Sequence, residues 1–271
     1  MRATSQASLD AAMGTWETTL AATGSKAARL GEELFAVVDV LDGSAALRRA
    51  LTEPNRDGSS KANLVAGVFE GKVSEETLDL LSGLARSRWS AEGDFAEACE
   101  QLAVTAVLVS AETREELASL EDDVFRMIRV LADNRDLRLA LAEKDRSRED
   151  RIRLLKSVFS EHVGGEALTL AARTISSGRS KSITAGLNLV SELAAERRER
   201  LLAVVTAAVP LSTAQQERLT DMLSRSYGRT IQVNITVDPA VVGGLRIQVG
   251  NEVVDGTILS RLEEARRRVA G

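Results

Sequence analysis

Histidine and cysteine, two residue types that often act as catalytic groups or zinc ligands, occur once each in this 271-residue chain, as His162 and Cys99. A Ser-His-Asp or Cys-His site would have to use His162, and no nucleophile and acid are arranged around it in a recognisable pattern. A structural zinc site or a disulfide needs more Cys and His than the chain has. We therefore predict no catalytic residue, no metal site and no cofactor, with His162 on the surface near a helix end and Cys99 in a core.

Glycines near the C-terminus suggest a second kind of chemistry, the binding of phosphate. Gly243, Gly244 and Gly250 lie close together, but no Gly-Lys-Ser/Thr follows them and their flanks read as strands. We predict a hairpin or bulge in which these glycines take positive φ. For Asp255 we predict a structural role as well, because either Asp255 or Thr257 is expected to cap the final helix.

Composition excludes further classes. The net charge is −5 and aromatic residues make up 3% of the chain, which argues against a nucleic-acid binder, since phosphate contacts need basic groups and base stacking needs aromatic ones. The longest apolar run, Leu102 to Val109, is eight residues with a Thr inside, far below the ~20 that span a bilayer. The N-terminus lacks a signal-peptide pattern. We expect a cytoplasmic protein that reaches a membrane only through partners.

The sequence pattern changes once along the chain, from helical to strand-like. No proline occurs from 55 to 209, and this stretch is rich in Ala, Leu, Glu and Arg, which favour helices. After about residue 200, apolar and polar residues alternate as they do in half-buried strands. We expect a strand at 201–209, followed by a helix that begins with a capping box of Ser212 and Gln215. Strands are expected at 231–237 and 245–249, and Val253 and Val254 follow after a turn. A final helix is expected from Thr257.

The helical region repeats itself with a period of 90 residues. Residues 33–81 match 123–171 without gaps at 16 of 49 positions, including Phe35 with Phe125 and Phe69 with Phe159, whereas chance would give roughly four matches. Most identities are large apolar residues at helical spacing, so we interpret the repeat as one core built twice. In the second copy we predict helices near 112–132, 134–143, 147–162, 164–178 and 182–200.

The predicted fold is mainly α, with two tandem helical bundles followed by a small α/β C-terminal domain. The expected boundaries are 1–92 for the first bundle, 93–200 for the second and 201–271 for the C-terminal domain. Residues 92–111 stand between the copies. Our hypothesis is that they form both the last helix of the first bundle and the first helix of the second.

The most specific pattern is the C-terminal segment 231–250, which resembles the signature of the F-type ATP synthase delta subunit, whose mitochondrial counterpart is the oligomycin-sensitivity-conferring protein. The following residues 251–257 are similar to the family as well, although the family usually has Ser where Thr257 stands. We expect the signature positions to be structural. They are Ile231, Val233, Val237, Asp238, Val241, Gly243, Gly244, Leu245, Ile247, Gln248, Gly250 and Asp255.

The resemblance covers residues from about 112 to the C-terminus, and the first copy is additional, as in extended delta subunits whose N-terminal bundle is duplicated. It implies a non-catalytic stator subunit of a proton-translocating ATP synthase. Such a subunit links the catalytic head, through the N-terminal helices of the alpha subunits, to the b subunits of the peripheral stalk, so that rotor torque drives ATP synthesis. It also implies a peripheral position at the cytoplasmic face of the cell membrane, without direct insertion.

Several alternatives stay open at this point. A generic cytoplasmic helical adaptor with other partners is the rival function. A third class, an enzyme with a site between its domains, finds almost no support, because no cluster of acid–base or nucleophilic residues is visible. The clusters Glu112–Glu116 and Glu196–Arg200 suit partner docking or a solvated helix face. Trp16 and Trp89 suit a partner anchor or a core. We predict that the second copy binds alpha, because it precedes the C-terminal domain in the family's usual order.

Overall fold

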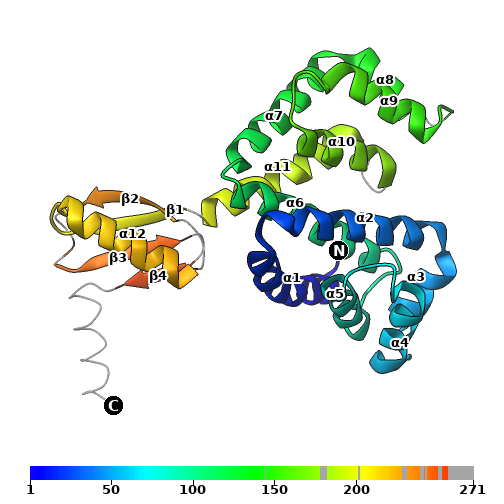
Figure 1. The fold of residues 1–271 in the computed structure, drawn as a ribbon, viewed down its shortest axis with the longest axis horizontal. Helices are drawn as coiled ribbons and strands as arrows, with labels where there is room; N and C mark the ends of the chain where they lie inside the picture. The colour runs from blue at the N-terminus through cyan, green and yellow to red at the C-terminus, as the bar shows by residue number, and fades with distance from the viewer. Residues whose placement is uncertain are drawn as a thin grey trace. The chain divides into compact units, whose positions relative to one another are not determined.

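The computed structural model describes residues 1–143, 145–177, 182–200, 202–227, 231–238, 241, 243–249 and 252–255. The chain forms two compact units, Met1–Leu193 and Ala194–Gly271 (Figure 1). The first unit is helical. Its elements are α1 (Ala3–Thr23), a 3-10 turn η1 (Gly24–Lys26), α2 (Ala27–Gly43), α3 (Ala45–Thr52), α4 (Gly58–Phe69), α5 (Glu75–Arg86), α6 (Asp94–Thr113), α7 (Leu117–Asp133), α8 (Arg135–Ala142), α9 (Arg148–Phe159), α10 (Gly165–Ser177) and α11 (Ile183–Arg200), which continues past Leu193.

The repeat in the sequence is a repeat in the structure. Helices α7, α8, α9 and α10 each begin 90 residues after α2, α3, α4 and α5 respectively. Polar contacts recur with the same spacing: the Arg48 guanidinium donates to the backbone C=O of Leu41, and that of Arg138 donates to the C=O of Leu131. The prediction of two tandem helical bundles is therefore confirmed, and we call α1–α5 the first series and α7–α11 the second series.

Helix α6 stands between the two series and is buried almost all round. Residues 102–111 are all buried, and Phe95 and Cys99 have no exposed surface. The helix packs against α1, α2, α3 and α5 and also contacts α7. A helix that is apolar on every face needs neighbours on every face. This is the environment that a helix common to two bundles requires, and the sharing of 92–111 stays our hypothesis.

The junction between α6 and α7 differs from the prediction of one helix over 112–132. Helix α6 continues to Thr113, and α7 begins only at Leu117. The N–H of Glu116 donates to the C=O of Ala111 at 2.8 Å, and Glu115 lies between them with φ of +61°. This is the geometry of a Schellman helix end, which usually places Gly at the left-handed position. Because Glu stands there instead, the sequence shows no stop signal.

A close approach at Gly31 allows α2 to pack on α6. A Cβ added at Gly31 would lie 2.8 Å from the C=O oxygen of Ala103 and 3.1 Å from a methyl group of Val107. Backbone at that distance must move to admit a side chain, which costs packing energy. Only glycine fits this crossing without a shift.

We expect Gly31→Ala to lower the free energy of unfolding by about 1–3 kcal/mol, since the added methyl group overpacks the α2–α6 contact. Gly83→Ala in α5 is the matched control. A Cβ at Gly83 meets no atom within 4 Å, so this change is expected to raise stability by about 0.5–1 kcal/mol through helix propensity. Urea unfolding followed by circular dichroism measures both, and shifts of the same sign would contradict the close approach.

The carboxylate of Glu33 on α2 holds the start of α5. It accepts hydrogen bonds from the Ser74 N–H at 2.8 Å, the Ser74 hydroxyl at 2.7 Å and the Thr77 hydroxyl at 2.9 Å. Partial burial raises the pKa of Glu33, but the hydrogen bonds from Ser74 and Thr77 outweigh it, so its pKa lies below the usual value of 4.5. The second series repeats the device, because Asp123 accepts from the N–H of Gly164 at 2.7 Å.

Glu33→Gln is expected to lower the free energy of unfolding at pH 7 by about 1–2 kcal/mol, because an amide accepts these bonds less strongly. The folded-state pKa lies below the unfolded one, so the carboxylate stabilises fully above about pH 5, and its contribution is lost as pH falls through the folded-state pKa. Urea titrations at pH 7 and pH 3 should show a gap between wild type and variant that narrows in acid. A gap independent of pH would contradict this account.

The second compact unit contains a mixed sheet covered by a helix. Its described elements after α11 are β1 (Leu202–Ala207), α12 (Thr213–Tyr227), β2 (Gln232–Val237), β3 (Leu245–Val249) and β4 (Glu252–Asp255). The strand order is β2-β1-β3-β4, with β1 parallel to β2 and the other pairs antiparallel. Helix α12 lies across one face (Figure 1) and buries Leu219 and Leu223 against Ala203, Val205 and Val249.

The strands and the helix predicted for this unit are confirmed where it is described. The expected strand at 201–209 is β1, and Ser212 and Gln215 form the capping box, with the Ser212 N–H donating to Gln215 Oε1 at 2.9 Å. The turn at Gly250 and Asn251 and the final helix from Thr257 lie outside the described residues.

Candidate interaction surfaces

The residue types most often used in catalysis occupy ordinary structural positions. His162 is exposed in the turn after α9, and its backbone C=O accepts from the Arg126 guanidinium at 2.7 Å. Cys99 is buried in α6. Both placements agree with the sequence analysis. Within the described ranges, no three His, Cys, Asp or Glu side chains come together in a way that could hold a metal ion.

Both tryptophans belong to the core. Trp16 on α1 donates its indole N–H to the C=O of Leu102 on α6 at 3.1 Å. Trp89 donates to the C=O of Leu84 at 2.9 Å and meets the ring of Phe95 edge-on at 5.7 Å. Neither side chain is available to a partner, so the core alternative holds for both.

The signature residues lie in the sheet of the second unit. Gly243 and Gly244 have φ of +74° and +87°, so they take the positive φ predicted for a bend between strands rather than forming a phosphate loop. Asp238 follows the end of β2 and donates its N–H to the C=O of Ala207 at 2.9 Å. Asp255 ends β4, and Gly250 lies outside the described residues. The remaining members differ in exposure: Ile231 is buried, Val233, Val241, Leu245 and Ile247 are half-buried, and Val237 and Gln248 are exposed.

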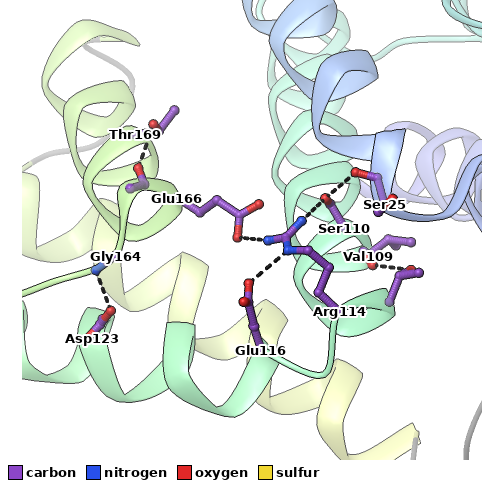
Figure 2. A network of polar contacts seen from close by, with 11 residues as sticks. Ser25, Val109, Ser110, Arg114, Glu116, Asp123, Gly164, Glu166 and Thr169 are labelled. Atoms are coloured by element: carbon purple, nitrogen blue, oxygen red, sulfur yellow. Dashed lines mark hydrogen bonds and ion pairs between the residues drawn. The ribbon is translucent and has the colours of Figure 1, made fainter.

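One polar network joins the two series at the end of α6 (Figure 2). The Arg114 guanidinium donates to Glu116 at 2.9 Å and to Glu166 on α10 at 2.7 Å. It also donates to the Ser110 hydroxyl at 2.6 Å, which in turn donates to the C=O of Ser25 in η1 at 2.9 Å. Hydrogen bonds to Glu166 and then to Glu116 raise the pKa of Arg114 further above its usual value. Within the charged segment 112–116, Arg114 and Glu116 therefore make contacts inside the helical unit.

A second contact between the series is centred on Arg173 of α10, which is 8% exposed. Its guanidinium donates to Asp39 on α2 at 2.8 Å and lies over the ring of Phe35, 4.9 Å from its centre. Arg148 at the start of α9 approaches the same Asp39 carboxylate at 3.5 Å. The sequence analysis missed this contact, because the partners are far apart in the chain and their pairing has no local pattern.

The interpretation of the repeat as one core built twice is wrong at one matched pair. Phe35 is 6% exposed, whereas its counterpart Phe125 is 56% exposed. The reason lies in the neighbours: α10 covers Phe35, and the described part of the chain places no corresponding helix over Phe125. The pair Phe69 and Phe159 is buried in both copies, as expected. An exposed aromatic ring on α7 is therefore the clearest candidate interaction feature of the helical unit.

The sequence profile of the family described as "ATP synthase delta (OSCP) subunit" matches residues 104–269 of this chain. The chain belongs to the ATP synthase delta (OSCP) subunit family. A protein named ATP synthase subunit delta from Beutenbergia cavernae is 49% identical over 271 residues, 100% of both chains. A protein of the same name from Streptomyces griseus is 44% identical over 92% of both chains. Another from Kineococcus radiotolerans is 44% identical over 98% of this chain and 96% of the relative.

Membership confirms the family resemblance seen in the C-terminal segment and makes the chain a non-catalytic subunit. The matched region of the delta family begins inside α6, so α1–α5 precede it. The Beutenbergia cavernae relative aligns with the whole chain, so it has a counterpart of this first series. None of the described helices is long and apolar enough to cross a bilayer.

Proposed function

We propose that this delta-family chain is part of an ATP synthase complex, in which it acts as the stator link between the catalytic head and the peripheral stalk. It would stop the head from turning with the rotor, so that proton-driven torque is used for ATP synthesis at the cytoplasmic face of the cell membrane. The observation that carries the proposal is the full-length similarity to proteins named ATP synthase subunit delta.

The contacts of the helical unit support a mechanical role. A stator element must carry load between its attachment points without its parts moving separately. Here the two series are joined at two charged contacts, Arg114 with Glu166 and Arg173 with Asp39. Ion pairs that combine hydrogen bonds with burial hold geometry better than isolated surface pairs do.

The proposed partners are the alpha subunits and the b subunits. The N-terminal helices of alpha would dock on the helical unit by helix-in-groove packing, and the C-terminal ends of b would contact the C-terminal unit. We assign the alpha contact to the second copy, which precedes the C-terminal unit. Titrating an alpha N-terminal peptide against fragments 1–113 and 93–200, both of which contain α6, tests the assignment. Binding to the first fragment alone would reverse it.

Deletion of the gene tests the proposed function itself. Membranes from the deletion strain should lose the catalytic head and should make no ATP from an imposed proton gradient, and adding the purified chain back should restore both. A generic adaptor with other partners would leave head attachment and ATP synthesis intact. Retention of both in the deletion strain would therefore overturn the stator role.

A further inference from the structure

Side chains of the second series reach across to one short segment of α2 in the first. Arg173 on α10 donates to Asp39 at 2.8 Å, and Arg148 at the start of α9 approaches the same carboxylate at 3.5 Å. The Arg173 guanidinium also lies over the ring of Phe35, 4.9 Å from its centre. One turn of α2 therefore contacts two different helices of the second series.

The internal repeat shows that these contacts are not shared by the two copies. The arginines that join the series stand, in each case, 90 residues after a glycine of the first copy. The pairs are Arg114 with Gly24, Arg148 with Gly58 and Arg173 with Gly83. Glycine makes up 19 of the 271 residues, so composition alone does not account for three such matches. The acceptor differs as well, because Arg129 stands 90 residues after Asp39.

The two copies therefore keep similar helices but differ at the residues that join them. Glycine has no side chain that could pair with a carboxylate, so the first copy cannot hold another helix in the way that the second is held. Its α2 face is already in use inside the chain, since α10 covers Phe35, which is 6% exposed. These differences indicate a division of labour between the copies.

We propose that the first series is an internal support for the second, in which Phe35 and Asp39 are positioning residues that fix α9 and α10. The additional copy then serves the partner-binding surface of the second copy rather than presenting an equivalent surface at its own α2. This functional part rests on the proposed contact between the second copy and alpha. Helices that are fixed before binding lose less ordering free energy when a partner docks, which favours affinity.

Hydrogen–deuterium exchange of the purified full-length chain, measured by mass spectrometry, tests the support. Asp39→Asn keeps the shape of the side chain and removes its charge, and Asp39 is exposed enough for the variant to fold. We expect amides of α9 and α10 to exchange about fivefold faster, while those of α3 and α4 keep their wild-type rates. Glu32→Gln, at an exposed position on the same helix, is the matched control and should change neither series.

The exchange pattern separates positioning from a general loss of stability. Asp39→Glu retains the charge and should give rates between those of wild type and Asp39→Asn. Unchanged rates in α9 and α10 of Asp39→Asn would overturn the proposal. So would equal acceleration in both series, because that would show only a less stable helical unit.

Titration of an alpha N-terminal peptide against the full-length chain tests the functional part. Asp39→Asn should bind about threefold more weakly than wild type, and Glu32→Gln should bind as tightly as wild type. Equal binding by all three chains, with α9 and α10 exchanging faster in Asp39→Asn, would overturn the role in partner binding. A wild-type chain that binds no peptide would contradict the alpha contact itself, and the exchange pattern would then decide the support of α9 and α10 separately.

Discussion

Trp16→Ala is expected to lower the free energy of unfolding of the helical unit by about 3–5 kcal/mol, the largest effect of any single change considered. Trp16 is 1% exposed, so its removal leaves a large cavity between α1 and α6. It also leaves the C=O of Leu102 without the indole N–H that donates to it at 3.1 Å. Since α6 packs against α1, α2, α3 and α5 and also contacts α7, we expect a cavity at this helix to weaken more of the unit than α1 alone.

Urea unfolding followed at 222 nm measures the loss, because the helices dominate that signal. Trp16→Phe separates the two causes: it keeps most of the volume and removes the hydrogen bond, and should cost about 1–2 kcal/mol. Leu139→Ala is the surface control and should change stability by less than about 0.5 kcal/mol. If Trp16 were instead an anchor for a partner, Trp16→Ala would leave the isolated chain as stable as the wild type.

The architecture of the helical unit could be predicted because its signals are local and repeated. The helix predicted at 134–143 is Arg135–Ala142, and that at 164–178 is Gly165–Ser177. Amphipathic spacing and the 90-residue period act together here, since each series constrains the interpretation of the other. The strands followed for a similar reason, because the alternation at 231–237 and 245–249 is strict.

The sequence failed where the outcome depends on distant neighbours. Phe35 and Phe125 are the same residue at the same repeat position, yet one is buried and the other exposed, because only Phe35 is covered by Arg173, 138 positions further along the chain. The end of α6 was missed for a different reason. Glu115 adopts φ of +61°, a conformation that sequence patterns assign to Gly or Asn.

The candidate site residues also divide into those that the sequence indicates and those that depend on distant neighbours. The signature residues of the delta family could be named from sequence because the family resemblance is concentrated in one segment, residues 231–255. The side chains that join the two series, Arg114 and Arg173, had no such signal. Gly83 stands 90 residues before Arg173, so comparing the copies shows that the arginine is a feature of the second copy alone. That asymmetry is the signal by which the contact could have been found.

Arg173→Ala is expected to lower the free energy of unfolding by about 2–4 kcal/mol and to loosen α10 from α2. The change removes a buried cation that donates to Asp39, lies over Phe35 and approaches Glu100 within 4.0 Å. Arg173 is the buried member of the contact, and its removal leaves Glu100, which is 16% exposed, without this nearby cation and opens space beside Phe35. Asp39 is partly exposed and near Arg148, which moderates the loss.

A double-mutant cycle of Arg173→Ala and Asp39→Ala measures this contact directly. The cycle should give a coupling energy of about 1–3 kcal/mol, whereas the exposed pair Arg153 and Asp150 should give less than about 0.5 kcal/mol. Arg173→Lys keeps the charge but loses the planar group that stacks on Phe35, and should fall between wild type and Arg173→Ala. Additive effects of Arg173→Ala and Asp39→Ala would mean that this pair does not help to hold α10 on α2, and would contradict the assigned contact.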